Sequence, residues 1–146
     1  MNAMSAIAAY KDVSLDIDVV DADPHKLAAM LYDGALVAIR QAKNEMQQGN
    51  TEAKGRAISK AIAIIGDGLQ KGLDIKAGGE IAQNLFALYS YMVKRLVTAN
   101  ATNNAAILDE ITRLLSELQE AWNAIRPQVA PTAPAGERRL SGQVRA

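Results

Sequence analysis

The sequence predicts an all-α protein: an antiparallel up-down four-helix bundle with a short N-terminal cap segment and a disordered C-terminal tail. Three observations support this fold. Through residues 24–126, apolar residues recur every three to four positions, as they do on one face of a helix. Proline, glycine and asparagine divide that stretch into four segments of similar length with short connections, the arrangement typical of an up-down bundle. With 146 residues, 49% of them hydrophobic, the chain can also bury one core.

The first two helices have clear end signals. Asp23-Pro24 joins an N-cap acceptor to a proline suited to the first helical turn. Gly49-Asn50 ends this helix after about Gln48. The second helix is predicted over residues 51–73, ending before Gly78-Gly79, which we interpret as a turn.

The third and fourth helices follow the same logic. Glu80 places a carboxylate in the first turn of the third helix, where the helix dipole favours it, and this helix is predicted to reach about Ala99. Asn100–Asn104 then turns the chain into the fourth helix. That helix ends at Pro127, because proline cannot continue a helix. Residues 127–146 are rich in proline and lack periodicity, which predicts a disordered tail.

Residues 1–23 are predicted to form a cap and an extended segment rather than part of the bundle. Ile7 and Tyr10 lie one helical turn apart and could dock as a short lid. Beyond them, apolar residues alternate with polar ones, as in an extended strand with one buried face. These apolar residues are Val13, Leu15, Ile17 and Val19. The chain offers no second strand, so this segment lies across the bundle, which we favour, pairs with another molecule, or remains loose.

The second and fourth helices each carry enough apolar surface for one core. The second has Ile58, Ile62, Ile65, Leu69 and Leu73. The fourth has a central stripe of Ile107, Ile111, Leu114, Leu118 and Ile125, with Leu108, Leu115 and Trp122 on its shoulder.

The first and third helices carry more apolar surface than one core needs. On the third, a core stripe and a second stripe lie about 100° apart around the axis. The core stripe is Ile81, Leu85, Leu88, Met92 and Leu96, and the second is Phe86, Tyr89, Val93 and Val97. On the first, the core face of Leu27, Leu31, Ala35, Ala38 and Ala42 is widened by Leu36, Val37 and Ile39. The surplus suits deeper burial, a homodimer interface, or a groove for an amphipathic helix.

Composition argues against several functional classes. Sixteen basic and sixteen acidic side chains cancel, so the charge typical of a nucleic-acid binder is missing. Without cysteine and with one histidine, His25, the chain cannot form the usual zinc or di-iron sites. We expect His25 to be an exposed polar residue. The sequence shows no recognisable pair of a catalytic nucleophile and a general base, so we expect neither an enzyme nor a bound cofactor.

The chain also lacks the signals of membrane insertion and secretion. No uncharged apolar run approaches the roughly 20 residues of a membrane span, and no basic residue precedes the apolar residues of the N-terminus. We therefore expect a soluble, cytoplasmic chain.

An ordered set of short motifs carries a resemblance to a known family. Over about residues 7–126 these include Asp23-Pro24-His25-Lys26-Leu27, Met30-Leu31-Tyr32-Asp33-Gly34-Ala35, Lys60-Ala61-Ile62-Ala63-Ile64-Ile65, Gly68-Leu69, Gly72-Leu73-Asp74, Gly78-Gly79-Glu80-Ile81-Ala82, Asn84-Leu85, Leu88-Tyr89, Tyr91-Met92, Arg95-Leu96, Ala99-Asn100 and Ala121-Trp122. In this order they resemble the flagellar secretion chaperones of the FliS family.

The resemblance implies a bundle that binds the C-terminal segment of flagellin, which is disordered when free and becomes helical in grooves on the chaperone. Such binding would block premature polymerisation in the cytoplasm and deliver flagellin to a component of the flagellar type III export gate. We expect contacts from surplus apolar residues and the N-terminal lid, called below the predicted contact residues. They are Ile7, Tyr10, Leu36, Ile39, Phe86, Tyr89, Val93 and Val97. The alternative is a structural bundle that self-associates through the extra stripes.

Overall fold

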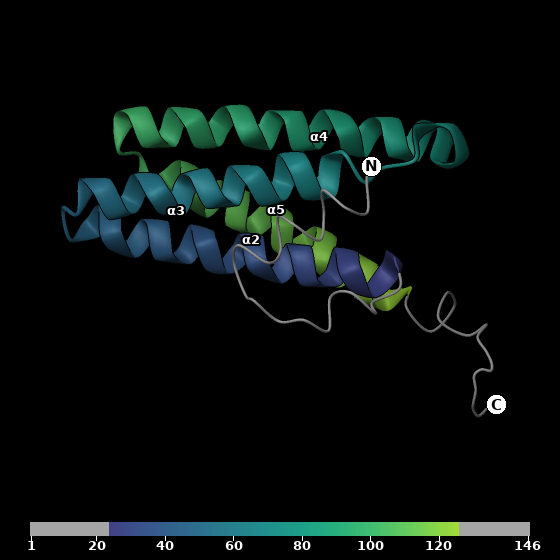
Figure 1. Ribbon diagram of the computed structural model, residues 1–146, viewed down its shortest axis with the longest axis horizontal. Helices are drawn as coiled ribbons and strands as arrows, with labels where there is room; N and C mark the ends of the chain where they lie inside the picture. The colour runs from purple at the N-terminus through teal and green to yellow at the C-terminus, as the bar shows by residue number, and fades with distance from the viewer. Residues whose placement is uncertain (1–23, 126–146) are drawn as a thin grey trace, which may run out of the picture.

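Four helical rods run side by side along the long axis of the computed structural model, which describes residues 24–125 (Figure 1). They are α2 (Pro24–Gln47), α3 (Thr51–Ala63) continued by the π-helix η2 (Ile64–Gln70), α4 (Ile75–Thr102) and α5 (Ala105–Ala124). The predicted all-α four-helix bundle is confirmed. The predictions for the cap and extended segment at 1–23 and for the tail at 127–146 lie outside the described residues.

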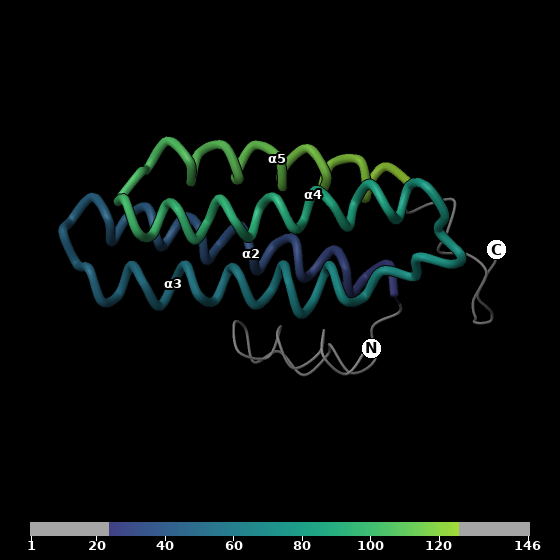
Figure 2. Tube along the Cα trace, turned by 90° about the horizontal axis from the view of Figure 1, so that it is seen from above, coloured from purple at the N-terminus to yellow at the C-terminus, as the bar shows by residue number. Residues whose placement is uncertain are grey.

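The helices are arranged around the core in chain order. α2 contacts α3 and α5, while α4 contacts η2, α3 and α5, so α2 and α4 occupy diagonal positions. Figure 2, seen from above, shows α5 and α3 on the two sides of this diagonal pair. The start of α2 and the end of α5 meet at one end of the bundle (Figures 1 and 2). Within residues 24–125, no helix has the length and apolar character needed to cross a membrane.

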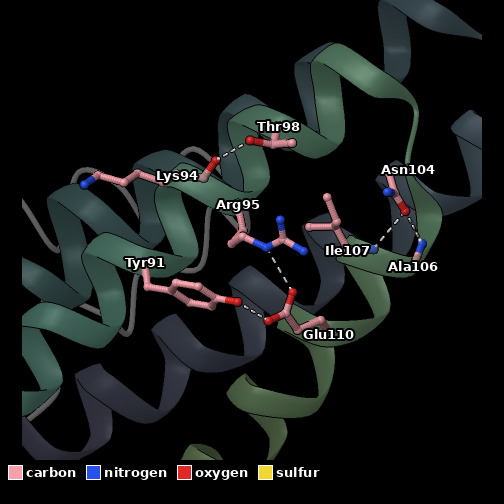
Figure 3. A network of polar contacts seen from close by, with 8 residues as sticks. All are labelled: Tyr91, Lys94, Arg95, Thr98, Asn104, Ala106, Ile107 and Glu110. Carbon is pink, nitrogen blue, oxygen red and sulfur yellow. Dashed lines mark hydrogen bonds and ion pairs between the residues drawn. The ribbon is translucent and has the colours of Figure 1, made fainter.

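The helix ends follow local chemistry closely. Gly49, with φ of 79°, lies in the turn after α2. Asn103 adopts the left-handed conformation, with φ of 52°, and ends α4 three residues beyond the predicted Ala99. The side chain of Asn104 then caps α5 by accepting hydrogen bonds from the backbone N–H groups of Ala106 and Ile107 (Figure 3).

The second predicted helix differs from a regular α-helix. It continues through η2 and ends at Gln70 rather than at Leu73. The turns of η2 are wider than those of an α-helix: the Lys71 N–H bonds to the Gly66 carbonyl, five residues earlier, at 3.2 Å. A Cβ placed on Gly68 would lie only 3.1 Å from the Leu31 side chain, so glycine lets this wider segment approach α2 closely. These are tertiary constraints that the apolar period does not reveal.

The start of α4 has two parts. Asp74 caps a first turn by accepting a hydrogen bond from the Ala77 N–H at 3.0 Å. The helix then breaks at Gly79, with φ of 58° and ψ of −135°, and resumes at Glu80, the predicted start. Both views show this first turn extending past the ends of α2 and α5. Ile81, predicted in the core, follows the break and is 73% exposed, so that prediction is wrong.

The core confirms most of the predicted stripes and shifts two of them. Tyr89, assigned to the second stripe of the third helix, is instead buried with Met92 and Leu96. On α5, the predicted shoulder residues Leu108 and Leu115 are fully buried, because this helix packs against both α2 and α4. The predicted central residues Leu114 and Leu118 are only partly buried, and Ile125 is exposed.

Candidate functional site

One flank of α4 faces α3 and η2. Its residues follow one another at intervals of three and four positions: Phe86, Ser90, Val93, Val97 and Asn100. Gln70, the last residue of η2, fixes one end of this flank. Its side-chain Nε2 donates to the Phe86 carbonyl at 2.9 Å and to the Ser90 hydroxyl at 2.6 Å.

Glycines form the opposite side of the same seam. A Cβ placed on Gly66 would lie 3.9 Å from Cγ2 of Val93, and one placed on Gly55 would lie 4.0 Å from Oδ1 of Asn100. No side chain on α3 or η2 occupies these two positions. On the α4 side, 44% of Phe86 and 54% of Val97 are exposed. We call this seam the α3–α4 groove.

An open hollow of about 950 Å³ lies beside the far end of the groove. It is lined by Thr51, Glu52, Lys54, Gly55, Arg56, Ser59, Lys60, Ala63 and Asn100. Arg56 and Lys60 give it cationic groups, and the nearest carboxylate oxygen of Glu52 is 3.9 Å from Arg56. The groove therefore combines an apolar flank with a basic border, which suits an amphipathic helix with acidic residues on one side.

A buried lysine, Lys54, joins α3 to the end of α4. Its Nζ donates to the Asn100 carbonyl at 2.9 Å and to Oδ1 of Asn103 at 2.6 Å, and only 3% of the residue is exposed. A cation at a helix C-terminus satisfies carbonyl groups that have no partner within the helix. The sequence pattern alone did not reveal this role. The available signal was that Lys54 precedes Ala57, Ile58 and Ala61 on the inward face of α3.

Beneath the groove, two tyrosines meet in the core. The hydroxyl groups of Tyr32 on α2 and Tyr89 on α4 are 2.6 Å apart, and both residues are almost completely buried. Burial raises the pKa of both hydroxyls, so both stay protonated at neutral pH.

The other flank of α4 is fastened to α5 (Figure 3). Tyr91 donates a hydrogen bond to Glu110, and Arg95 Nε forms an ion pair with the same carboxylate at 3.1 Å. The hydrogen bond from Tyr91, helped by Arg95, lowers the pKa of Glu110. In turn, the carboxylate raises the pKa of Tyr91.

The predicted contact residues do not form one surface. Phe86 and Val97 are exposed on the α3–α4 groove and Val93 is half-buried there, whereas Tyr89 lies in the core. Ile7 and Tyr10 lie outside the described residues.

The two predicted contact residues on α2 lie away from the groove. Ile39 is only 1% exposed. Leu36 is half-buried and stands two helical turns before Lys43, whose ion pair with Asp109 of α5 is 2.8 Å long, so it faces the α2–α5 side. The exposed apolar residue of α2 is Val37, beside a second hollow lined by Arg40, Gln41, Lys43, Asn44 and Gln47.

The expectation that His25 is exposed is wrong. Its ring stacks on Trp122 with the ring centres 4.7 Å apart, and only 5% of the residue is exposed. His25 Nε2 lies 2.9 Å from the Trp122 carbonyl, while Trp122 Nε1 donates to the His25 carbonyl at 2.9 Å.

Within residues 24–125, no group of three or more histidine, aspartate or glutamate residues could hold a metal ion.

Comparison with known proteins adds a family relationship. The family model described as "Flagellar protein FliS" matches residues 6–129. Over 130 residues the chain is 48% identical to the flagellar secretion chaperone FliS of Salmonella typhimurium, covering 89% of this chain and 96% of the relative. It is 45% identical over 125 residues to the flagellar secretion chaperone FliSB of Pseudomonas aeruginosa, covering 86% and 98%. It is 40% identical over 122 residues to the flagellar secretion chaperone FliS of Escherichia coli, covering 84% and 90%.

Proposed function

The chain belongs to the FliS family of flagellar secretion chaperones, and from this premise we propose that it binds the C-terminal segment of flagellin in the cytoplasm. Binding keeps that segment from polymerising early, and the complex then passes to a component of the flagellar type III export gate. The protein acts by binding, without catalysis. The observation that carries this proposal is the α3–α4 groove, where Phe86 and Val97 remain exposed beside glycine positions.

The energetics require a client that contacts more than this groove. Fully burying a large apolar side chain contributes roughly 1.5–3 kcal/mol. Since about half of Phe86 and of Val97 is already covered, each would contribute about 1 kcal/mol on binding. Ordering a segment that is disordered when free costs about 2–5 kcal/mol or more. The client therefore has to extend along the groove and onto other faces.

The remaining predicted contact residues fit this extended contact. Leu36 and the neighbouring Val37 offer a second apolar area on the other side of the bundle. A segment that folds on binding can wrap a large surface. Ile7 and Tyr10 are proposed to cap part of the client surface. Tyr89 is buried beneath the groove, and Ile39 is buried in the core away from it, so neither is proposed to contact the client directly.

The test is isothermal titration of the full chain with the C-terminal segment of its own organism's flagellin, together with light scattering. We expect a saturable one-to-one complex with a large negative heat-capacity change, as coupled folding onto an apolar surface requires. Val97→Asp should weaken binding roughly tenfold or more, because it places a carboxylate in an apolar contact. Val97 suits this test better than Val93, which is half-buried beside Gly66.

The matched control is Thr98→Asp. It adds the same charge one residue further along α4, at an exposed position about 100° around the helix from the groove. We expect it to bind flagellin like the parent. Equal affinity for the Val97 and Thr98 variants, both folded by circular dichroism, would remove the groove from the client site. A stable homo-oligomer that gives no heat with flagellin would instead support the self-associating bundle.

A further inference from the structure

The apolar pattern of α4 leaves its rotation about its own axis ambiguous. Apolar residues cover a wide arc of the helix, and the large side chains in the middle of that arc are buried, at Tyr89, Met92 and Leu96. Val97 lies on the groove edge of the arc and is exposed. Leu88 lies on the other edge and is half-buried; it is nine residues from Val97, about half a turn around the axis. A modest rotation of α4 would bury the groove edge and expose the Leu88 edge.

The hydrogen bond between Tyr32 and Tyr89 is sensitive to that rotation. α2 and α4 are diagonal in the bundle, so the bond crosses the core. Turning α4 either way would separate the two hydroxyls and leave both in an apolar interior. An unpaired buried hydroxyl is strongly disfavoured, whereas a shifted apolar side chain can often repack.

The other polar contacts of α4 hold it less tightly. The Gln70 bond to the Phe86 carbonyl and the Tyr91 bond to Glu110 are both exposed. Water can replace exposed bonds of this kind at little free-energy cost. The Gln70 bond to Ser90 and the Arg95 bond to Glu110 are only part-buried. Buried Lys54 binds the backbone carbonyl of Asn100, which lies near the axis of α4 and moves less when the helix turns. The buried pair is therefore the contact that most strongly distinguishes one rotation from another.

We propose that Tyr32 and Tyr89 are positioning residues whose hydrogen bond fixes the rotation of α4 and so keeps Phe86 and Val97 facing the groove. The bond selects one of several rotations that the apolar pattern would accept. Buried polar pairs set helix register in this way in other helical assemblies. The importance of this role for client binding rests on the proposed function, whereas the effect on α4 itself does not.

The test combines Tyr32→Phe with Tyr89→Phe in the full chain. Tyr32→Phe alone leaves the Tyr89 hydroxyl without its partner, so we expect a lower urea midpoint. The double variant removes both hydroxyls and should recover the parent's stability or exceed it. If the hydrogen bond only stabilised the fold, the double variant would show no change in the rotation of α4 or in the affinity for flagellin.

The rotation of α4 is read with a thiol label. Because the natural chain has no cysteine, a single Leu88→Cys or Val97→Cys substitution gives an unambiguous site. In the double-phenylalanine background we expect the thiol at position 88, which is half-buried in the parent, to label roughly tenfold faster, because the rotation exposes it further. The affinity for the flagellin segment should fall severalfold in the same background.

Each outcome decides the inference. Faster labelling at position 88 with parental stability and weaker flagellin binding supports it. Unchanged labelling in a stable double variant overturns it, as does a double variant less stable than either single variant. Faster labelling with unchanged flagellin affinity would overturn the role in client binding. If the parent itself binds no flagellin, the proposed function fails. The ratio of labelling rates at position 88 between the double variant and the parent still decides whether Tyr32 and Tyr89 fix the rotation of α4.

Discussion

Replacing Lys54 should destabilise the bundle more than replacing any exposed lysine. The hydrogen bond from Lys54 Nζ to the Asn100 carbonyl is shielded from water by the buried stem of the lysine side chain. A hydrogen bond from a charged donor is worth about 1.5–3 kcal/mol, and the second bond, to the exposed Asn103, adds about 0.5–1 kcal/mol because that amide can rehydrate. We therefore expect Lys54→Met to lower the free energy of unfolding by about 2–4 kcal/mol.

Methionine keeps most of the apolar stem, so this change isolates the ammonium group. The assay is urea unfolding followed by far-ultraviolet circular dichroism, with the m-value checked against the parent. Lys76→Met is the matched control: Lys76 is exposed, and we expect a change within about 0.5 kcal/mol. If the two variants unfold at the same urea concentration, Lys54 is not what secures the end of α4, and the reasoning from its two bonds is refuted.

Three further predictions test other parts of the fold. Gly79→Ala should destabilise the protein by about 1–2 kcal/mol in urea unfolding, because φ of 58° is strained for alanine, whereas Gly55→Ala, at an ordinary helical position, should not. A destabilisation as large in Gly55→Ala would contradict this. His25→Ala should shift the fluorescence emission of the single tryptophan to longer wavelength and lower the free energy of unfolding by about 1–3 kcal/mol, because it removes the stacked ring and a hydrogen bond. Unchanged emission would disprove the contact between His25 and Trp122. The pKa of Tyr32 and Tyr89 is raised in the folded state, so their contribution to stability is full below the ordinary tyrosine pKa of about 10 and is lost as pH rises above it. The double phenylalanine variant should therefore lose less stability than the parent between pH 9 and about 12, measured by urea unfolding at each pH. Parallel stability curves for the two proteins would refute this.

The sequence located most helix ends to within a few residues, because caps and turns are local chemistry. Gly49, Gly79 and Asn104 each act within a few residues of their own position. The predicted second helix failed at η2 for the opposite reason. Its wide turns depend on how closely Gly68 approaches Leu31 of α2, and that is a property of the packed bundle.

The candidate site was predicted in part. Phe86 and Val97 are exposed, as an apolar surplus on the third helix suggested. Tyr89 belongs to the same sequence stripe, yet its hydroxyl finds a partner 57 residues away in Tyr32, so it is buried. Ile81 repeats the core spacing, but it lies just after the break at Gly79 and is exposed. Periodicity gives the width of an apolar arc, while its rotation and its end depend on neighbouring helices.

The contact between His25 and Trp122 also bears on how the chain folds. These residues are 97 positions apart, so the contact closes a loop that holds almost the whole bundle. Closing so long a loop is entropically demanding, and α2 can pair with α3 through a short turn well before it meets α5. During synthesis α5 also emerges last, so its docking onto α2 completes the bundle. Substitutions at this contact should mainly speed unfolding, while substitutions between α2 and α3 should slow folding.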